Sequence, residues 1–515
     1  MNKKYNVLLI TSDQQHFDTI GKFNPEIKTP NLDRLCNAGT YFNRAYTVNP
    51  TCTPTRATLI TGKYPSQHGA WTLGTKLSEK ETTIGELLQE EGIRTALVGK
   101  AHFQPLMRTE KYDSLEAYPV LHDLDFWRNF DEDFYGFDTV KLARNHTNES
   151  HVGQHYAIWM EEKGFKDWRK YFLPCSTQVE KTDGLFDLTM EQSIKYDWGI
   201  PEAYHYNAWI AEETNTLLES YKANNEQFFL WASFFDPHPT YLVPKGWEEV
   251  YDPEQLTLPH MVEGEHEDSP EIVKKSQEVS PDYSKYRKTG FALHGMESHV
   301  GKSEVEKKKD LAVYYEMVTL MDKYIGQILD KLDALGLTEE TIIIFTTDHG
   351  HYMGQHGLYA KGPYMYEDAI KVPYIVSCPG TVTSNHVSEA MQSLVDIPTT
   401  ILDYCGVEIP YAMTGKNQRN VWEGKEESVR DHIICEHHHE RHTVNLRAYV
   451  NERYKLVIQQ NEMYGQLYDL ENDPGEIKNL WSVPEYAEVK EQLMMQYMWA
   501  ELAKESLFMP RIANA

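Results

Sequence analysis

The chain has few cysteines, and none of them belongs to a short paired motif. Its six cysteines are scattered over 515 residues without a Cys-x-x-Cys pair. The sequence therefore does not predict the disulfide framework of a secreted protein. Isolated thiols fit a reducing compartment, so we expect a cytoplasmic, bacterial enzyme.

The chain also lacks long apolar runs and an excess of basic residues. No apolar run approaches membrane-spanning length, and the short run Val7–Thr11 leads straight into polar residues, which favours a buried first strand over a secretory signal. Acidic residues outnumber basic ones by 78 to 50, for a formal charge of -28. This charge repels polyanions, so we expect neither nucleic acid nor membrane as a partner. An anionic substrate must find its positive charge locally, in a pocket or on a metal.

Short apolar runs alternate with helical patterns along most of the chain. This alternation is typical of an α/β fold with a large, mostly parallel sheet flanked by helices. The clearest predicted helix follows Ser303, where Ser-Glu-Val-Glu forms a capping box. An apolar stripe at helical spacing follows it, made of Leu311, Tyr315, Val318, Ile325, Leu329 and Leu332. The runs predicted as buried strands are Val7–Thr11, Thr95–Val98, Phe228–Phe235, Ile342–Thr347 and Tyr374–Ser377.

Two stretches interrupt this alternation, and the last part of the chain differs from the rest. Residues 105–200 and 262–300 lack clear periodicity, so we expect them to be insertions over the sheet that line a substrate entrance. From about residue 431, short strand patterns precede a helical pattern over 485–505. We therefore predict a catalytic domain over 1–425 and a smaller C-terminal α+β subdomain over 426–515, carrying a short antiparallel sheet.

Polar side chains with catalytic or ligand chemistry follow four of the predicted strands directly. In open α/β sheets, ligands bind outside the carboxyl ends of the strands. Four strands that each deliver such residues predict one shared site at that edge. The residues are Asp13 and Gln14, Lys100 and His102, Asp236 and His238, and Asp348 and His349.

A fifth feature is the run Cys52-Thr53-Pro54-Thr55-Arg56. A lone cysteine is usually a small buried hydrophobe, so the run alone decides little. A cysteine followed by a small residue, proline, a small residue and arginine is, however, the pattern that a maturation enzyme reads when it oxidises the thiol to the aldehyde formylglycine.

Together these segments resemble the type I, formylglycine-dependent sulfatases of the alkaline-phosphatase superfamily. The resemblance covers most of the chain except 105–200 and 262–300. It implies that the protein is a sulfatase, a sulfuric ester hydrolase that releases an alcohol or phenol and inorganic sulfate. The matching segments are Asn6–Gln14, Thr29–Asp33, Cys52–Arg56, Leu59–Gly62, Gly99–Phe103, Asp236–His238, Thr346–Gly350, Lys361–Gly362 and Leu467–Glu476.

The resemblance implies a nucleophile at position 52 and a metal beside it. The hydrate of formylglycine offers one oxygen to attack sulfur and a second to break the covalent intermediate by elimination. One divalent cation with hard oxygen ligands would neutralise the sulfate oxygens. Family members often carry an aspartate where this chain has Gln14, and the neutral amide makes Ca²⁺ the first choice, with Mn²⁺ or Mg²⁺ open. The implied ligands are Asp13, Gln14, Asp348, His349 and the modified Cys52.

The remaining implied roles belong to five side chains. Arg56 would hold the aldehyde hydrate, and Lys100 and Lys361 would bind the sulfate oxygens. His102 would take a proton from the second hydroxyl of the hydrate, and His238 would protonate the departing oxygen. For each of these residues an ordinary structural or surface role is the alternative.

Two other readings of the chain remain open. Phosphonate monoester or phosphodiester hydrolases of the same superfamily also use formylglycine and the Asp-Gln opening, but carry tyrosine and threonine where Lys100 and His102 stand here. A non-catalytic binder of sulfated ligands would keep Cys52 as a thiol. The sequence leaves the ester open, from a small alkyl or aryl sulfate to a saccharide sulfate, and also leaves open assembly into a homo-oligomer.

Several further residues have no assigned role. The run Glu436-His437-His438-His439-Glu440-Arg441-His442 looks like a metal cluster, but consecutive histidines on a strand point to opposite faces. A loop or an edge near the substrate is the other interpretation of that run. Five more residues are candidates for the leaving-group pocket or for structural roles, namely Trp127, Trp159, Trp168, His351 and His356.

Overall fold

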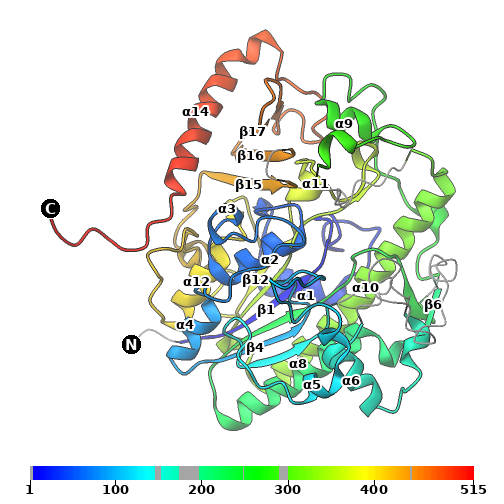
Figure 1. Cartoon of the computed structure of the whole chain (residues 1–515), viewed down its shortest axis with the longest axis vertical. Coiled ribbons are helices and arrows are strands. Elements are labelled where there is room, and N and C mark those ends of the chain that lie inside the picture. Colours follow the sequence, from blue (N-terminus) through cyan, green and yellow to red (C-terminus); the bar gives the residue numbers. More distant parts are fainter. Residues whose placement is uncertain are drawn as a thin grey trace.

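The structure, a computed structural model, describes residues 4–144, 152–172, 197–247, 249–288, 300–440 and 443–514. An eight-stranded sheet forms its centre, in the order β13-β2-β12-β9-β1-β7-β4-β5 (Figure 1). The five strands from β9 to β5 run parallel, whereas β12 is antiparallel to both of its neighbours. The predicted fold class, a large and mostly parallel sheet, is confirmed.

The central strands form where the apolar runs were predicted. Their residues are mostly apolar, with many β-branched and aromatic side chains, and are buried on both faces, as expected for strands covered by helices on two sides. The strands of this sheet are β1 (Asn6–Ser12), β2 (Thr40–Phe42), β4 (Arg94–Gly99), β5 (Thr139–Leu142), β7 (Phe228–Ser233), β9 (Thr341–Thr347), β12 (Tyr374–Ser377) and β13 (His386–Ser388).

Helices cover both faces of the sheet and bury alternate residues of each strand. Val7 and Leu9 of β1 pack into one core with α2, α4 and α12, whereas Leu8 and Ile10 pack into a second core with α1, α6, α8 and α10. The helices are α1 (Pro30–Ala38), α2 (Cys52–Thr61), α4 (Ile84–Glu90), α6 (Gln154–Glu162), α8 (Tyr206–Asn224), α10 (Glu304–Ala334) and α12 (Asp396–Cys405).

The long helix α10 begins and packs as its sequence predicted. The hydroxyl of Ser303 accepts a hydrogen bond from the Glu306 backbone nitrogen, and the Glu306 carboxylate accepts one from the Ser303 backbone nitrogen. This reciprocal pair is the predicted capping box. All six residues of the predicted apolar stripe are buried.

The C-terminal part of the chain forms a second, antiparallel sheet. Its order is β15-β16-β17-β18, and the helix α14 (Ala487–Ala503) packs on it. Figure 1 shows this layer beyond one end of the central sheet, on the side of α2 and α3 (Pro65–His68). The Glu436 backbone nitrogen donates to the Val48 carbonyl at 2.7 Å, which ties β15 to the segment that precedes α2. The strands are β15 (His432–His438), β16 (Asn445–Asn451), β17 (Tyr454–Gln459) and β18 (Gln466–Asp469).

One predicted insertion contributes to the central sheet. Residues 105–200 were expected to lie over the sheet, but Thr139–Leu142 forms its edge strand β5, parallel to β4. The prediction was wrong there because a four-residue strand is too short to show a period. Trp127, Trp159 and Trp168 of the same stretch are buried in the two cores, which favours their structural role.

Candidate active site

The four predicted strand ends meet because the register of the parallel strands aligns them. Ser233 of β7 pairs with Thr11 of β1 and with Gly99 of β4, and Ser12 pairs with Thr347 of β9. The polar residues that follow these strands therefore emerge at one edge of the sheet.

The end of β4 places Lys100 through a close backbone approach. Gly99 has a φ of +107°, and a Cβ atom built on it would lie 1.9 Å from the Ser233 carbonyl oxygen. Only glycine permits this approach. The same carbonyl accepts a hydrogen bond from the Lys100 backbone nitrogen at 3.1 Å, and the Lys100 ammonium pairs with Asp13.

Cys52 is the first residue of α2 and is almost fully buried. Its sulfur lies 3.2 Å from Nε2 of His349, 3.7 Å from Oδ1 of Asp13 and 3.3 Å from Nζ of Lys361. Burial and the Asp13 carboxylate raise the pKa of the thiol, but Lys100 and Lys361 act in the opposite direction and bring it below its ordinary value. The first residue of a helix also lies in the positive field of the helix dipole. Position 52 thus favours a negative charge.

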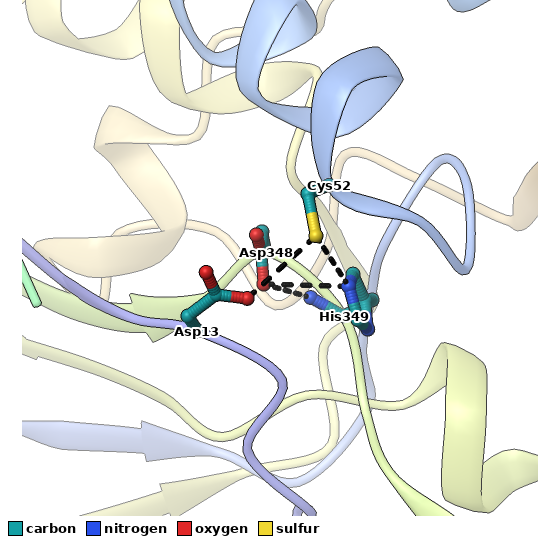
Figure 2. Close-up of side chains that lie close together, drawn as sticks. All are labelled: Asp13, Cys52, Asp348 and His349. Atoms are coloured by element: carbon teal, nitrogen blue, oxygen red, sulfur yellow. Dashed lines mark hydrogen bonds and ion pairs between the residues drawn. The ribbon is translucent and has the colours of Figure 1, made fainter. Parts of the chain in front are cut away.

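Asp13, Cys52, Asp348 and His349 form a compact buried group (Figure 2). One ligand atom from each lies within 4.8 Å of the others. His349 uses Nδ1 to contact the Gly350 carbonyl at 2.9 Å, which leaves Nε2 directed at the group. Two carboxylates and a ring nitrogen around one point are a suitable ligand set for a divalent cation.

Gln14 is a further candidate ligand, because its side-chain oxygen is buried and has no hydrogen-bond partner in the described part of the chain. Its backbone nitrogen donates to Oδ1 of Asp348 at 3.0 Å, which fixes the residue beside the group. A buried amide oxygen without a partner is costly unless something binds it. This oxygen and the neighbouring carboxylates are hard donors that fit a divalent cation.

Arg56 forms ion pairs with the two carboxylates of this group, Asp13 and Asp348. Its Nε donates to Asp348 at 2.8 Å, and its Nη2 lies 3.6 Å from Asp13, with all three side chains inaccessible to solvent. Its Nη1 donates to the Lys100 carbonyl at 2.9 Å and to the Ser233 hydroxyl at 2.8 Å. The arginine therefore joins the ends of β4, β7 and β9.

Lys361 contacts both Cys52 and His238. The Lys361 ammonium is 3.2 Å from Nε2 of His238, and Nδ1 of that ring contacts the Pro239 carbonyl. Burial lowers the pKa of Lys361, but the charges of Cys52, Asp13 and Asp348 outweigh it and raise the pKa above its ordinary value. Lys361 therefore stays cationic although it is buried.

His102 follows Lys100 and is held by its backbone. Its nitrogen donates to the buried carboxylate of Glu116 at 2.8 Å, and its φ of +59° turns the chain sharply. Burial, followed by the charges of Arg144, Lys100 and Arg56, lowers the pKa of the imidazole well below its ordinary value. The ring is therefore neutral and able to accept a proton.

Two profiles of known protein families match this chain, and together they cover most of its length. The profile of the sulfatase family matches residues 5–407. The chain belongs to the sulfatase family. A second profile, described as the C-terminal part of N-sulphoglucosamine sulphohydrolase, matches residues 354–503. The predicted enzyme class, sulfuric ester hydrolase, and its reaction, hydrolysis of a sulfate ester, are confirmed.

Individual relatives span nearly all of this sulfatase. An arylsulfatase of Clostridium perfringens is 28% identical over 493 residues, covering 94% of this chain and 92% of the relative. An N-acetylglucosamine-6-O-sulfatase of Bacteroides thetaiotaomicron is 23% identical over 528 residues, covering 96% and 85%. The solved phosphonate monoester hydrolase of Agrobacterium radiobacter has a TM-score of 0.77 at 23% identity, covering 98% of this chain and 97% of that structure. Because only 23% of the residues are identical, the similarity to the phosphonate monoester hydrolase shows a shared fold and nothing about the reaction.

Several polar residues around the site of this sulfatase carried no sequence signal. Ser233 accepts from Arg56 and donates to the Lys100 carbonyl, and Glu116 holds the His102 turn. Asp236 was predicted to lie at the shared edge of the sheet, without a role of its own. Its carboxylate accepts from Tyr206 and Asn207 of α8, and burial raises its pKa to about 7. It anchors the loop that carries His238.

The histidine run of β15 does not form a second metal group in the described residues, which exclude positions 441 and 442. Glu436 binds the Ser66 hydroxyl and the Lys504 ammonium, so it joins β15 to α3 and α14. His438 packs edge-on against Trp71, with ring centroids 5.4 Å apart. His356 stacks on Tyr366 at 3.8 Å, whereas His351 contacts Gln14.

Among the described residues, no helix combines the length and the apolar character needed to cross a membrane.

Proposed function

We propose that this sulfatase cleaves a sulfate monoester with formylglycine made from Cys52 by a maturation enzyme. The observation that carries the proposal is the position of the Cys52 sulfur, within contact distance of His349 and of the Lys361 ammonium. A thiol in a merely structural role needs neither a cluster of ligand atoms nor a buried cation beside it. The hydrated aldehyde would supply two oxygens on one carbon, one to attack sulfur and one to release sulfate.

We further propose that the chain holds one divalent cation, with Ca²⁺ the best match. Asp13, Asp348 and His349 would hold it together with the modified residue 52, because their ligand atoms lie close together, and Gln14 would add its buried side-chain oxygen, which has no hydrogen-bond partner in the described residues. When bound, the ion would neutralise charge on the sulfate oxygens. Hard oxygen donors, one of them a neutral amide, favour Ca²⁺ over softer metals.

The remaining side chains would bind the anion and move protons. Lys100 and Lys361 would attract the sulfate oxygens, and Arg56 would hold the aldehyde hydrate. The neutral ring of His102 would accept the proton of the second hydroxyl group. Nε2 of His238, which faces Lys361, would carry a proton to the departing oxygen. These buried cations would supply the local positive charge that the acidic chain needs.

The ester itself is a small molecule or a saccharide sulfate. The relative named N-acetylglucosamine-6-O-sulfatase supports a saccharide as the leaving group. A cytoplasmic location, assembly into a homo-oligomer and a boundary between domains near residue 425 stay predictions.

Phosphonate monoester hydrolysis is the second candidate reaction, because the Asp13-Gln14 opening and the fold of a solved phosphonate hydrolase are both compatible with it. We expect an aryl sulfate to be cleaved faster than the matching aryl phosphonate ester, since this chain carries Lys100 and His102 where the phosphonate hydrolases carry tyrosine and threonine. Parallel measurements of kcat/KM on one preparation test this order. Faster cleavage of the phosphonate would reverse the assignment.

His238→Ala is expected to lower kcat/KM by roughly 10²–10⁴-fold for an alkyl or sugar sulfate, whose leaving oxygen needs a proton. The loss for a nitrophenyl sulfate is expected to be much smaller, because nitrophenolate leaves without protonation. The exposed histidine His386, on β13, offers the control His386→Ala, with no change for either ester. Equal losses for both esters in His238→Ala would contradict the role in leaving-group protonation.

A further inference from the structure

The backbone and side chain of Gln14 are fixed at every polar atom except the side-chain oxygen. Its backbone nitrogen donates to Asp348, and its backbone carbonyl accepts from the Tyr314 hydroxyl at 3.0 Å. The side-chain nitrogen lies 2.7 Å from Nδ1 of His351. Only Oε1 lacks a hydrogen-bond partner in the described part of the chain. The side-chain oxygen is therefore the one polar atom of Gln14 that is left for a further partner in the described part of the chain.

His351 is buried and its ring cannot turn freely. The ring stacks on Tyr314, with centroids 4.9 Å apart and planes 11° apart, and meets the edge of the Tyr241 ring at 5.9 Å. Its backbone nitrogen donates to the Asp368 carbonyl at 2.8 Å. Two tyrosines and one backbone bond thus fix the direction of its ring nitrogens.

The contacts of His351 have a defined direction. An amide nitrogen only donates, so Nδ1 of His351 must accept from Gln14 and the ring proton must lie on Nε2. Nε2 lies 2.6 Å from the Tyr241 oxygen, which accepts that proton. The Tyr241 hydroxyl in turn is directed at the Met353 sulfur, at 3.5 Å. The chain Tyr241–His351–Gln14 therefore selects one tautomer of the ring.

The opposite tautomer would reverse the amide of Gln14. With a proton on Nδ1, His351 would donate to the side-chain oxygen, and the amide nitrogen would then take the position that this oxygen has in the structure. A nitrogen that carries two protons has no lone pair for a cation. The tautomer of one buried histidine thereby decides whether Gln14 is a ligand.

We propose that His351, oriented by Tyr241, is a positioning residue that turns the side-chain oxygen of Gln14 toward the metal site and so sets the affinity of that site for its cation. The proposal rests on the function proposed above, in which Gln14 is a ligand. It adds two residues that contact neither the cation nor the substrate. Tyr241 also follows His238 by three residues, so the loop that would deliver the leaving-group proton also supports a metal ligand.

The test is a calorimetric titration of Ca²⁺, repeated with Mn²⁺, into the full-length matured chain after removal of bound metal by a chelator. His351→Ala is expected to weaken binding by about 10–100-fold, the usual cost of losing a group that orients a ligand. Tyr241→Phe, which keeps the ring and loses the hydroxyl, is expected to weaken it by up to about tenfold. Tyr352→Phe is the matched control, because its buried hydroxyl has no hydrogen-bond partner in the described residues.

A double substitution distinguishes the positioning role of His351 from the proposed metal site in which Gln14 is a ligand. In a Gln14→Ala background, His351→Ala is expected to cause no further loss of affinity, since the group it orients is gone. An equal loss in both backgrounds would mean that His351 acts through the fold, and would overturn the proposal. Unchanged affinity in both His351→Ala and Tyr241→Phe would also overturn the positioning role. If Gln14→Ala still binds the cation more weakly in that case, the proposed metal site is retained. Unchanged affinity in Gln14→Ala would remove Gln14 as a ligand, and both proposals with it.

Discussion

Cys52→Ala is expected to lose sulfate ester hydrolysis by roughly 10⁴-fold or more, the scale seen when a covalent nucleophile is removed. Alanine cannot be converted to an aldehyde, and no other described nucleophilic side chain lies beside both His349 and Lys361 at this position. The measurement is kcat with a nitrophenyl sulfate, on protein produced together with a maturation enzyme. The Ca²⁺ titration of the same variant tells whether the remaining ligands still bind metal.

Cys435→Ala is the matched control for this experiment. Cys435 is equally buried, in β15, but burial raises the pKa of its thiol well above the ordinary value, which keeps the thiol protonated, and no catalytic role is assigned to it. We expect full activity in the control, with at most a modest loss of stability from the missing sulfur. Mass spectrometry of the Cys52 peptide supplies the second readout. Active protein in which that peptide carries an unmodified thiol would refute the nucleophile.

The central strands and the site were predictable from sequence for a shared physical reason. Apolar runs such as Ile342–Thr347 must be buried on both faces, and a parallel sheet is the structure that buries them. Parallel strands end at a common edge, so Asp13, Lys100 and Asp348 follow their strands into one place. The register of the sheet then brings the Asp13 and Lys100 side chains into contact.

The supporting residues were not predictable in the same way. Ser233, Glu116 and His351 act through hydrogen bonds to groups that the fold brings beside them, and a single serine or glutamate has no period or motif. The edge strand β5 was missed because its four residues alternate between buried and half-buried, which is too short a pattern to recognise. Local sequence reports what a residue type prefers, whereas these roles depend on which distant group the fold places beside it.

Acidic composition and anion chemistry are reconciled by burial of a few charges. Arg56 and Lys100 are inaccessible to solvent, where salt and water screen their charges least. The carboxylates of Asp13 and Asp348 offset the desolvation cost of burying these two cations. A bound divalent cation would make the net charge of the site positive, so that the site would attract an anion. The formal net charge of -28 over the whole chain therefore does not decide what the site attracts.

Arg56→Met is expected to lower the free energy of unfolding by about 3–5 kcal/mol, the cost of leaving one partner of a buried ion pair without its counter-charge. Its guanidinium contacts Asp348 at 2.8 Å and Asp13 at 3.6 Å, and all three side chains are excluded from solvent. Urea denaturation followed by fluorescence measures the loss. Arg94→Met is the control, since Arg94 is half exposed and its pairs with Asp138 and Glu226 are worth at most about 1 kcal/mol.

A second substitution shows whether charge or shape is responsible for that loss. Asp348→Asn keeps the shape of the side chain and removes the charge that Arg56 neutralises, so adding it to Arg56→Met is expected to recover part of the stability. Activity is not expected to return, because the double variant has lost both a proposed metal ligand and the cation behind it. If Arg56→Met were no less stable than Arg94→Met, the two carboxylates would have to be neutralised by something other than arginine. If stability fell further in the double variant, Arg56 would matter for packing rather than for charge.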